Sequence, residues 1–377
     1  MGMGTLRCKK RVYPLMHSRA ECAVKNASSI QGSGKKSKTS TWTLQERVAP
    51  APILCETFPG AENNATKDLA VPNLTTFESP EDPMASVLIT GTSKGIGFET
   101  ALAFAHAGHT VHATMRNPSQ APQLAQTAAK EKLPIVVSTM DVDSDQSVSQ
   151  GIAQIHKDHG PIDVLVNNAG VERAGSIEEL PFSDFRSVME TNYFGALRCI
   201  QAVVPQMRQR RSGCIVNLTS VAGRITCPPM APYTASKWAL EALSEALAGE
   251  MKTFNVRVLI VEPGIIDTAM ARRLEDRPST SPYRQRDRFA SLFSESLKNP
   301  VPPSIVGKTI LEIVESGTWQ LRHPVGPDAV PFLEWRNHKT DEEWVDLNAS
   351  DDEAWYASLQ RDFGLDTRPK AARVKAS

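Results

Sequence analysis

The sequence has no excess of either charge, no long apolar run and no regular pattern of cysteines. Its 42 Lys and Arg balance 42 Asp and Glu, so the overall charge gives no reason to expect a nucleic-acid partner. No apolar run approaches the roughly 18–20 residues that a transmembrane helix needs. The six cysteines include no Cys-x-x-Cys pair. We therefore expect reduced thiols in an intracellular, cytoplasmic protein.

Residues 1–83 differ in composition from the rest of the chain. Pro, Ser, Thr and Asn are scattered through them, periodic apolar residues are few, and the first residues are basic. A segment of this kind does not bury enough apolar surface to fold, so we expect a disordered extension outside the folded core. Two other interpretations stay open: an organelle transit segment, which the basic, acid-poor start suggests, and a functional chain that begins at Met84.

An ordered pattern begins with a short apolar run over 85–90. It leads into the turn Gly91-Thr-Ser-Lys-Gly95-Ile-Gly97 and then into an apolar-periodic helix over 98–107. Strand, glycine-rich turn and helix form a context for phosphate binding, because glycines let backbone N–H groups approach and the helix N-terminus favours negative charge. The alternative is a tight turn without a ligand. We expect a dinucleotide to contact Gly91, Ser93, Lys94, Gly95, Ile96 and Gly97.

The second predicted strand, 110–115, has no acidic residue at its end. In dinucleotide-binding βαβ units, a carboxylate there holds the ribose 2′-hydroxyl of NAD(H). Here Arg116 follows the strand, and Lys94 lies in the glycine turn. Because two cations suit a 2′-phosphate, the sequence favours NADP(H) over NAD(H). The alternative is that both residues are solvated surface charges.

Two further predicted strands also end in residues suited to a ligand crevice. The strand over 135–140 precedes Asp141-Val142, and the strand over 162–166 precedes Asn167-Asn168-Ala169-Gly170. In open parallel sheets, ligands bind beyond the carboxyl ends of the strands. We expect the adenine near Asp141 and Val142, and a close backbone approach at Asn168, Ala169 and Gly170. The Asn pair has a second interpretation as a turn signal alone.

Asn192 and Ser220 are polar residues in positions that predict a role. Asn192 lies within the apolar stripe of a long predicted helix over 183–210. An Asn is unfavourable there, so it is either a satisfied core group or part of a site. Ser220 follows the strand over 214–219, where its hydroxyl is placed to bind a substrate oxygen.

Tyr233 and Lys237 are four residues apart at the start of a predicted helix whose other face is apolar. They therefore lie on one helical face, one turn apart. A free phenol has a pKa near ~10. A neighbouring cation favours the phenolate, and proton transfer improves as the pKa approaches the working pH. The spacing alone is a weak signal, because many surface helices carry it by chance.

The last part of the chain carries a predicted nucleotide contact and several appended segments. The strand over 256–262 ends in Pro263-Gly264, after which Ile266 and Thr268 are expected to lie beside a nicotinamide. The charge-dense residues 269–318 predict a mobile lid over the crevice. A last strand is expected over 319–323 and a turn over 324–328. Residues 326–377, acidic with interleaved Trp, are expected to form a terminal appendage or a subunit contact.

A metal site is not expected. His106, His109 and His112 recur every third residue. Their predicted positions at a helix end, a turn and a strand share no face, so they do not form a ligand set.

The order and spacing of these motifs resemble the short-chain dehydrogenase/reductase family over about 85–325. The resemblance rests on Thr90-Gly91-x3-Gly95-Ile96-Gly97, Asn167-Asn168-Ala169-Gly170, Asn192, Ser220, Tyr233-x3-Lys237 and Pro263-Gly264. Arg116, the turn over 324–328 and the length of the C-terminal part resemble its retinol/17β-hydroxysteroid dehydrogenase branch. The resemblance implies an α/β fold with a Rossmann-type doubly wound parallel sheet, in one catalytic domain over 84–325 that includes the lid.

The resemblance also implies roles for the four candidate catalytic residues. Tyr233 would exchange a proton with the carbonyl or alcohol oxygen while hydride passes to or from the nicotinamide. Lys237 would hold the nicotinamide ribose and favour the tyrosinate. Ser220 would bind and polarise the substrate oxygen. Asn192 would anchor a water linking Lys237 to solvent, and the chain would form a homodimer or homotetramer.

Two classes of function are compatible with the sequence. The first is an NADP(H)-dependent enzyme that interconverts an alcohol and a ketone or aldehyde on a moderately large apolar substrate of steroid or retinoid type, with a 3-oxoacyl thioester reductase as the alternative. The second is a non-enzymatic NADP(H)-binding regulatory module, against which the complete Asn, Ser, Tyr and Lys set argues. The apolar substrate is inferred from Ile225, Pro228, Pro229, Met230, Ile265, Ile266 and Met270.

Overall fold

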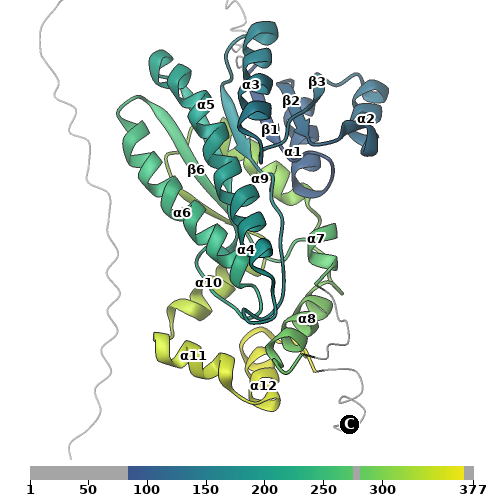
Figure 1. Ribbon diagram of the computed structural model, residues 1–377, viewed down its shortest axis with the longest axis vertical. Helices are drawn as coiled ribbons and strands as arrows, with labels where there is room; N and C mark the ends of the chain where they lie inside the picture. The colour runs from purple at the N-terminus through teal and green to yellow at the C-terminus, as the bar shows by residue number, and fades with distance from the viewer. Residues whose placement is uncertain (1–83, 275–280, 369–377) are drawn as a thin grey trace, which may run out of the picture. The chain divides into compact units, whose positions relative to one another are not determined.

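A seven-stranded, wholly parallel sheet forms the centre of the molecule (Figure 1). The computed structural model describes residues 84–274 and 281–368, and the predictions for residues 1–83, 275–280 and 369–377 lie outside them. The strand order is β3-β2-β1-β4-β5-β6-β7. The strands are β1 Ser86–Thr90, β2 Thr110–Met115, β3 Ile135–Thr139, β4 Val164–Asn167, β5 Gly213–Leu218, β6 Val256–Pro263 and β7 Arg322–Val325.

The strand order reverses between β1 and β4, which are direct neighbours. β2 and β3 lie on one side of β1, whereas β5 to β7 continue on the other side of β4. In an open parallel sheet, this reversal leaves a crevice at the carboxyl ends of the central strands. The predicted doubly wound Rossmann-type sheet is confirmed.

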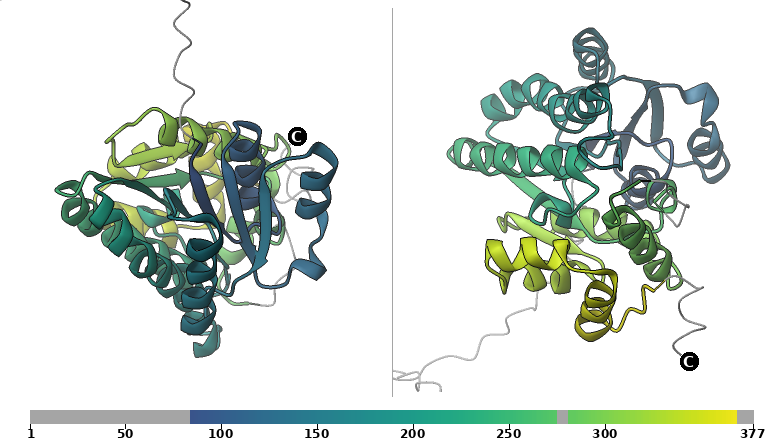
Figure 2. Two further views of the ribbon diagram at one scale, coloured as in Figure 1. Left: turned by 90° about the horizontal axis from the view of Figure 1, so that it is seen from above. Right: turned by 60° about the horizontal axis from the view of Figure 1, so that its bottom comes forward.

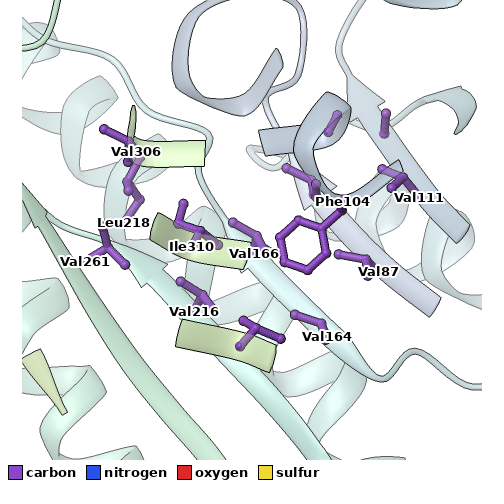
Figure 3. Close-up of a cluster of buried hydrophobic side chains, with 14 of the residues drawn as sticks. Val87, Phe104, Val111, Val164, Val166, Val216, Leu218, Val261, Val306 and Ile310 are labelled. Carbon is purple, nitrogen blue, oxygen red and sulfur yellow. The ribbon is translucent and has the colours of Figure 1, made fainter. Parts of the chain in front are cut away.

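One face of the sheet is covered by α1 Gly95–His106, α2 Gln123–Glu131 and α9 Ser304–Glu315. Phe104 of α1 is fully buried between strand residues that include Val87 and Val166, as Figure 3 shows. Val306 and Ile310 of α9 are equally buried in this layer. Since a fully buried aliphatic or aromatic side chain contributes roughly 1.5–3 kcal/mol, α9 is a core helix, although it lies within the segment 269–318 for which a lid is predicted.

The opposite face is covered by α3 Asp145–His159, α5 Gly195–Arg210 and α6 Ala231–Lys252. Figure 2 shows the helices on the two sides of the sheet. β-Strands buried on both faces have near-continuous apolar sequences, as the fully buried β1 run Val87, Leu88 and Ile89 illustrates. In the helices, the apolar residues that recur along the sequence predict which side of each helix faces the sheet.

The long helix predicted over 183–210 is interrupted at its middle. It consists of α4 Phe182–Met189, a π-helical turn η2 Glu190–Phe194, and α5. Such turns insert one residue into the helix and are frequent at functional sites. Here the turn carries Asn192, which is buried.

The C-terminal helices pack beside α8 Gln285–Ser296 beyond the carboxyl ends of the strands (Figures 1 and 2). They are α10 Ala329–Asn337, α11 Asp341–Ala349 and α12 Asp352–Phe363. Two of their tryptophans, Trp344 and Trp355, are buried in one apolar cluster with Ile225 and Leu292. The Trp344 indole also donates to the carbonyl of Thr226 at 2.9 Å.

The prediction of a last strand over 319–323 is wrong in its boundaries. β7 spans Arg322–Val325, so Pro324 and Val325 belong to the strand and not to the predicted turn. Pro324 is tolerated because β7 is an edge strand and pairs only with β6. The carbonyl of Val325 accepts a hydrogen bond from Gly264 N at 2.9 Å, which connects the strand to the turn after β6.

The described parts of the chain contain neither a membrane-spanning helix nor a disulfide. No helix in 84–274 or 281–368 is long and apolar enough to span a bilayer. Cys199, Cys214 and Cys227 carry free thiols, and the other three cysteines lie outside the described residues.

Candidate active site

A cavity of about 440 Å³ lies where the carboxyl ends of β1, β4, β5 and β6 meet α6 and the C-terminal helices. Eighteen of the sequence-predicted site residues line it, and the structure brings them together from the whole length of the sheet. They are Gly91, Ser93, Lys94, Gly95, Ile96, Arg116, Asp141, Val142, Asn168, Ala169, Gly170, Ser220, Tyr233, Lys237, Pro263, Gly264, Ile266 and Thr268. Gly97 and Asn192 do not line it, and of the residues from which the apolar substrate is inferred, Pro228 and Pro229 do not line it either.

The glycine turn after β1 has the backbone geometry of a phosphate cradle. Gly91 and Gly95 adopt φ angles of +73° and +64°, a region that L side chains rarely occupy. A Cβ at Gly91 would lie 2.7 Å from Cα of Ala169, so only glycine allows this approach of the two loops. α1 begins at Gly95 beside the cavity, and its N-terminus favours an anion. The turn therefore fits the pyrophosphate of a dinucleotide.

Gly97 has a packing role and does not contact the cavity. A Cβ there would lie 2.3 Å from Nδ2 of Asn168 and 2.6 Å from the carbonyl oxygen of Gly91. Asn168 occupies that space because its Nδ2 donates to the carbonyls of Thr90 (2.8 Å) and Gly91 (3.0 Å). The Asn after β4 thus holds the end of β1 and the glycine turn in place, and it also lines the cavity.

The end of β2 places positive charge at one end of the cavity. Arg116 and Lys94 are exposed and both line it. Asp143, beyond β3, also lines it and accepts a hydrogen bond from Thr191 Oγ1 at 3.0 Å. Burial raises the pKa of Asp143, whereas the Thr191 hydrogen bond and the nearby Arg116 charge lower it.

The turn after β6 is held by Asp328, a residue that the sequence analysis did not select. Asp328 Oδ2 accepts from Ile265 N at 2.8 Å, and a Cβ at Gly264 would lie 2.1 Å from Asp328 Oδ1. Thr268 caps the short helix α7 Ala269–Arg272, because its Oγ1 accepts from Ala271 N at 3.2 Å. These contacts fix the backbone of the loop in which Ile266 lines the cavity.

Ser220, Tyr233 and Lys237 converge at the inner part of the cavity. Ser220 follows β5, and its Oγ donates to the carbonyl of Pro263 at 3.3 Å and accepts from Ala222 N at 3.1 Å. Tyr233 and Lys237 occupy the first two turns of α6. Lys237 Nζ lies 5.6 Å from the centre of the Tyr233 ring and donates to the carbonyl of Leu218 at 2.7 Å.

Asn192 is a fully hydrogen-bonded core group next to this cluster. Its Oδ1 accepts from Val171 N at 2.8 Å, and its Nδ2 donates to Val171 O and Ser236 Oγ, both at 2.9 Å. A Cβ at Gly170 would lie 3.4 Å from Asn192 Oδ1 and 3.9 Å from Lys237 Nζ. Of the two interpretations left open by the sequence, the satisfied core group describes these contacts, and it connects the loop after β4 to α6.

The three histidines of the sequence pattern contact different partners. The ring nitrogens of His106, His109 and His112 lie 3.0, 3.2 and 3.0 Å from Glu131, Glu315 and Ser86, respectively. Within 84–274 and 281–368, no group of three or more His, Cys, Asp or Glu side chains is arranged to hold a metal ion.

Comparison with known proteins is consistent with this arrangement. The family model for short chain dehydrogenases matches residues 85–279, more than half of the chain. The chain belongs to the short-chain dehydrogenase family. It is 36% identical to bovine retinol dehydrogenase 8, over 67% of this chain and 85% of the relative. It is 35% identical to 3-ketodihydrosphingosine reductase of Bacteroides thetaiotaomicron, over 64% and 87%.

A solved short-chain dehydrogenase from Streptomyces avermitilis has a similar structure. It superposes with a TM-score of 0.62 at 30% identity, and the match covers 74% of this chain and 98% of that chain. The family assignment, the retinol dehydrogenase-like branch and the oxidoreductase class that the motifs predict are confirmed.

The electrostatics of Tyr233 in this short-chain dehydrogenase differ from the sequence expectation. The Tyr–Lys spacing predicts a lowered pKa, but the pKa of Tyr233 is raised to about 12. Burial of the hydroxyl is the largest cause; the Ser220 hydroxyl acts in the opposite direction, and the Glu172 charge raises the pKa further. Desolvation sets the direction of the shift, and helical spacing cannot reveal how deeply a hydroxyl is desolvated.

The ammonium group of Lys237 is buried at an energetic cost. Burial lowers the pKa of Lys237 from 10.5 to about 8, and the negative charge of Glu241 offsets part of this shift by raising the pKa. Between these two pH values the unfolded chain binds more protons than the folded chain, so the free energy of unfolding rises with pH. The destabilisation caused by burying this ammonium group is therefore complete below pH 8 and is lost as the pH rises through 10.5.

Replacing Lys237 with Met is therefore expected to increase stability at neutral pH while removing activity. We expect the free energy of unfolding to rise by about 1–2 kcal/mol at pH 7, with part of the gain offset by the lost bond to the Leu218 carbonyl. The gain should shrink between pH 8 and 10.5. Urea unfolding at several pH values measures it, with the exposed Lys252→Met in the same helix as control. A stability gain that is equal at pH 7 and pH 10 would contradict the burial argument.

An aromatic wall of the cavity was not predicted from the sequence. It consists of apolar and aromatic side chains from three helices: Phe289, Leu292 and Phe293 of α8, Phe332 and Trp335 of α10, and Trp355 of α12. The interleaved tryptophans of the C-terminal part were a visible signal, but sequence spacing does not show that α10 and α12 fold back to the cavity. Glu172, two residues after Gly170, was missed because a single loop residue carries no periodic pattern.

Proposed function

We propose that this short-chain dehydrogenase uses NADP(H) to interconvert an alcohol and a ketone or aldehyde on a moderately large apolar substrate. The observation that carries the proposal is one continuous cavity in which the glycine turn, Ser220, Tyr233 and Lys237 meet an aromatic wall. The non-enzymatic alternative gives no reason for a Tyr that lines the cavity beside a buried Lys.

The residues suit proton transfer coupled to a redox cofactor. When bound, the nicotinamide supplies or accepts the hydride. Ser220 and Tyr233 are placed to hold the substrate oxygen by their hydroxyls. Because the pKa of Tyr233 lies well above neutral, the residue carries its proton at neutral pH, as a proton donor in ketone reduction must. Lys237, one helical turn further, places a buried cation next to the ring.

Two features support the choice of cofactor and substrate. Arg116 and Lys94 place positive charge at the end of the cavity reached from β2, which suits a 2′-phosphate and hence NADP(H). The aromatic wall defined above lines the same cavity, and one relative is named for retinol and another for 3-ketodihydrosphingosine. A lipophilic alcohol or ketone fits both observations.

Cofactor oxidation over a graded ketone series tests the proposal. The purified full chain, supplied with NADPH, should turn over ketones and aldehydes, and kcat/KM should rise as the apolar part of the substrate grows. We expect each added buried methylene to contribute about 0.8 kcal/mol, or about fourfold, until the cavity is filled. Turnover confined to 3-oxoacyl thioesters would select the alternative reductase. NADPH binding without turnover of any carbonyl would favour a binding module.

A further inference from the structure

Glu172 is a buried carboxyl group on the cavity wall near the candidate catalytic residues. Its side chain is 8% exposed, and it lines the cavity two residues after Gly170. Its charge contributes to the raised pKa of Tyr233, which places the carboxyl group within electrostatic reach of the tyrosine hydroxyl. Burial also raises the pKa of Glu172 itself, and the charges of Arg273 and Arg173 lower it in part.

The interactions within the protein compensate this burial only in part. Among the described residues, Arg273 is the group within ion-pair distance: its Nε lies 3.4 Å from Glu172 Oε1. The Arg273 side chain is 53% exposed, so solvent screens the pair. A buried carboxylate is unfavourable unless it is paired and hydrogen-bonded. A long contact to a half-exposed arginine leaves capacity for a further hydrogen-bond donor.

The two other carboxyl groups that line the cavity, Asp141 and Asp143, each accept a hydrogen bond from the protein, while Asp143 Oδ1 is buried without a hydrogen-bond partner among the described residues. Asp141 Oδ1 accepts from Asp143 N at 3.2 Å, and Asp143 Oδ2 accepts from Thr191 Oγ1 at 3.0 Å. Both follow β3, on the side of the cavity that Arg116 shares. Glu172 instead follows β4, and both it and its partner Arg273 line the cavity.

We infer that Glu172 determines substrate specificity by accepting a hydrogen bond from a second polar group of the substrate, a hydroxyl or an ammonium group close to the reacting carbon. This inference rests on the proposed function. The preferred substrate is then a lipophilic ketone that carries a donor beside its carbonyl, with the apolar remainder against the aromatic wall.

A matched ketone series tests the inference in the full-length protein with NADPH. Each set contains an unsubstituted ketone, its α-hydroxy analogue and its α-amino analogue, with the same apolar remainder. In the wild type, kcat/KM should be higher for the donor-bearing ketones. In Glu172→Gln, the ratio of kcat/KM for the α-amino ketone to that for the plain ketone should fall by about 10–100-fold. The α-hydroxy ketone should fall less, because an amide oxygen still accepts a hydrogen bond.

Arg273→Gln is the matched control. It keeps the carboxylate and removes its partner, so the same ratio should stay at or above the wild-type value. If the pair only ties the loop after β4 to α7, both variants should lose activity equally on all three ketones, and the inference is wrong. The preference of the wild type is measured without any variant. If the wild type has equal kcat/KM values on the three ketones, the inference is wrong and the proposed function is unaffected. No turnover of any ketone overturns the proposed function itself.

Discussion

Replacement of Tyr233 with Phe is expected to lower kcat for ketone reduction by about 10²–10⁴-fold, the usual contribution of a positioned general acid. Phe keeps the ring beside Lys237 and removes the hydroxyl, so packing of α6 changes little. The loss should appear in kcat more than in KM, because the proton is transferred in the transition state. Steady-state NADPH oxidation with saturating ketone measures it.

The control for this variant is Tyr283→Phe. Tyr283 is a partly exposed tyrosine outside the cavity, and its replacement should leave kcat within about twofold of the wild-type value. NADPH binding, followed by fluorescence, should be retained in Tyr233→Phe. A Tyr233→Phe protein that binds NADPH and turns over ketone at the wild-type rate would show that another group supplies the proton.

Arg116→Asp is expected to reverse the cofactor preference. The substitution removes a charge-assisted hydrogen bond to a 2′-phosphate and introduces repulsion, while an acidic side chain after β2 suits the ribose 2′-hydroxyl of NAD(H). We expect the ratio of kcat/KM with NADPH to that with NADH to fall by about 10²–10³-fold, since each charged hydrogen bond contributes about 1.5–3 kcal/mol.

Arg286→Asp makes the same charge change at an exposed position of α8 outside the cavity. It should leave the cofactor ratio unchanged, which separates the local contact from a general loss of positive charge. An unchanged NADPH preference in Arg116→Asp would refute the argument that Arg116 selects the cofactor.

The carboxyl edge of the sheet was predictable, because strand, turn and helix alternate along the chain. Ser220, Asn168 and Asp141 each follow a short apolar run, and in a parallel sheet such positions must meet at one edge. The glycine turn was predictable for the same reason. What the linear pattern could not show is which glycine faces the cavity and which one packs: Gly97 makes room for Asn168, a residue 71 positions later in the chain.

Effects that depend on long-range packing were beyond the sequence. The pKa of Tyr233 is controlled by burial beneath segments distant in the chain, and its direction is opposite to the one that the Tyr-x3-Lys spacing suggests. The bounds of β7 are set by its pairing with β6. Its four residues include a proline and show no clear alternation of apolar and polar side chains, so the sequence alone does not indicate a strand there. The aromatic wall required helices α8, α10 and α12 to meet, and the sequence of each helix alone does not show that contact.

The contact between Asp328 and the turn after β6 limits how freely this protein can be treated as a set of exchangeable modules. Asp328 lies three residues beyond β7, at the start of the segment that forms the aromatic wall. It holds the backbone at Ile265 and fits only because residue 264 is glycine. Grafting the α10 and α12 part of the wall from a relative onto this sheet would therefore require the matching carboxylate as well, because the chain that forms this part of the wall also supports the turn after β6.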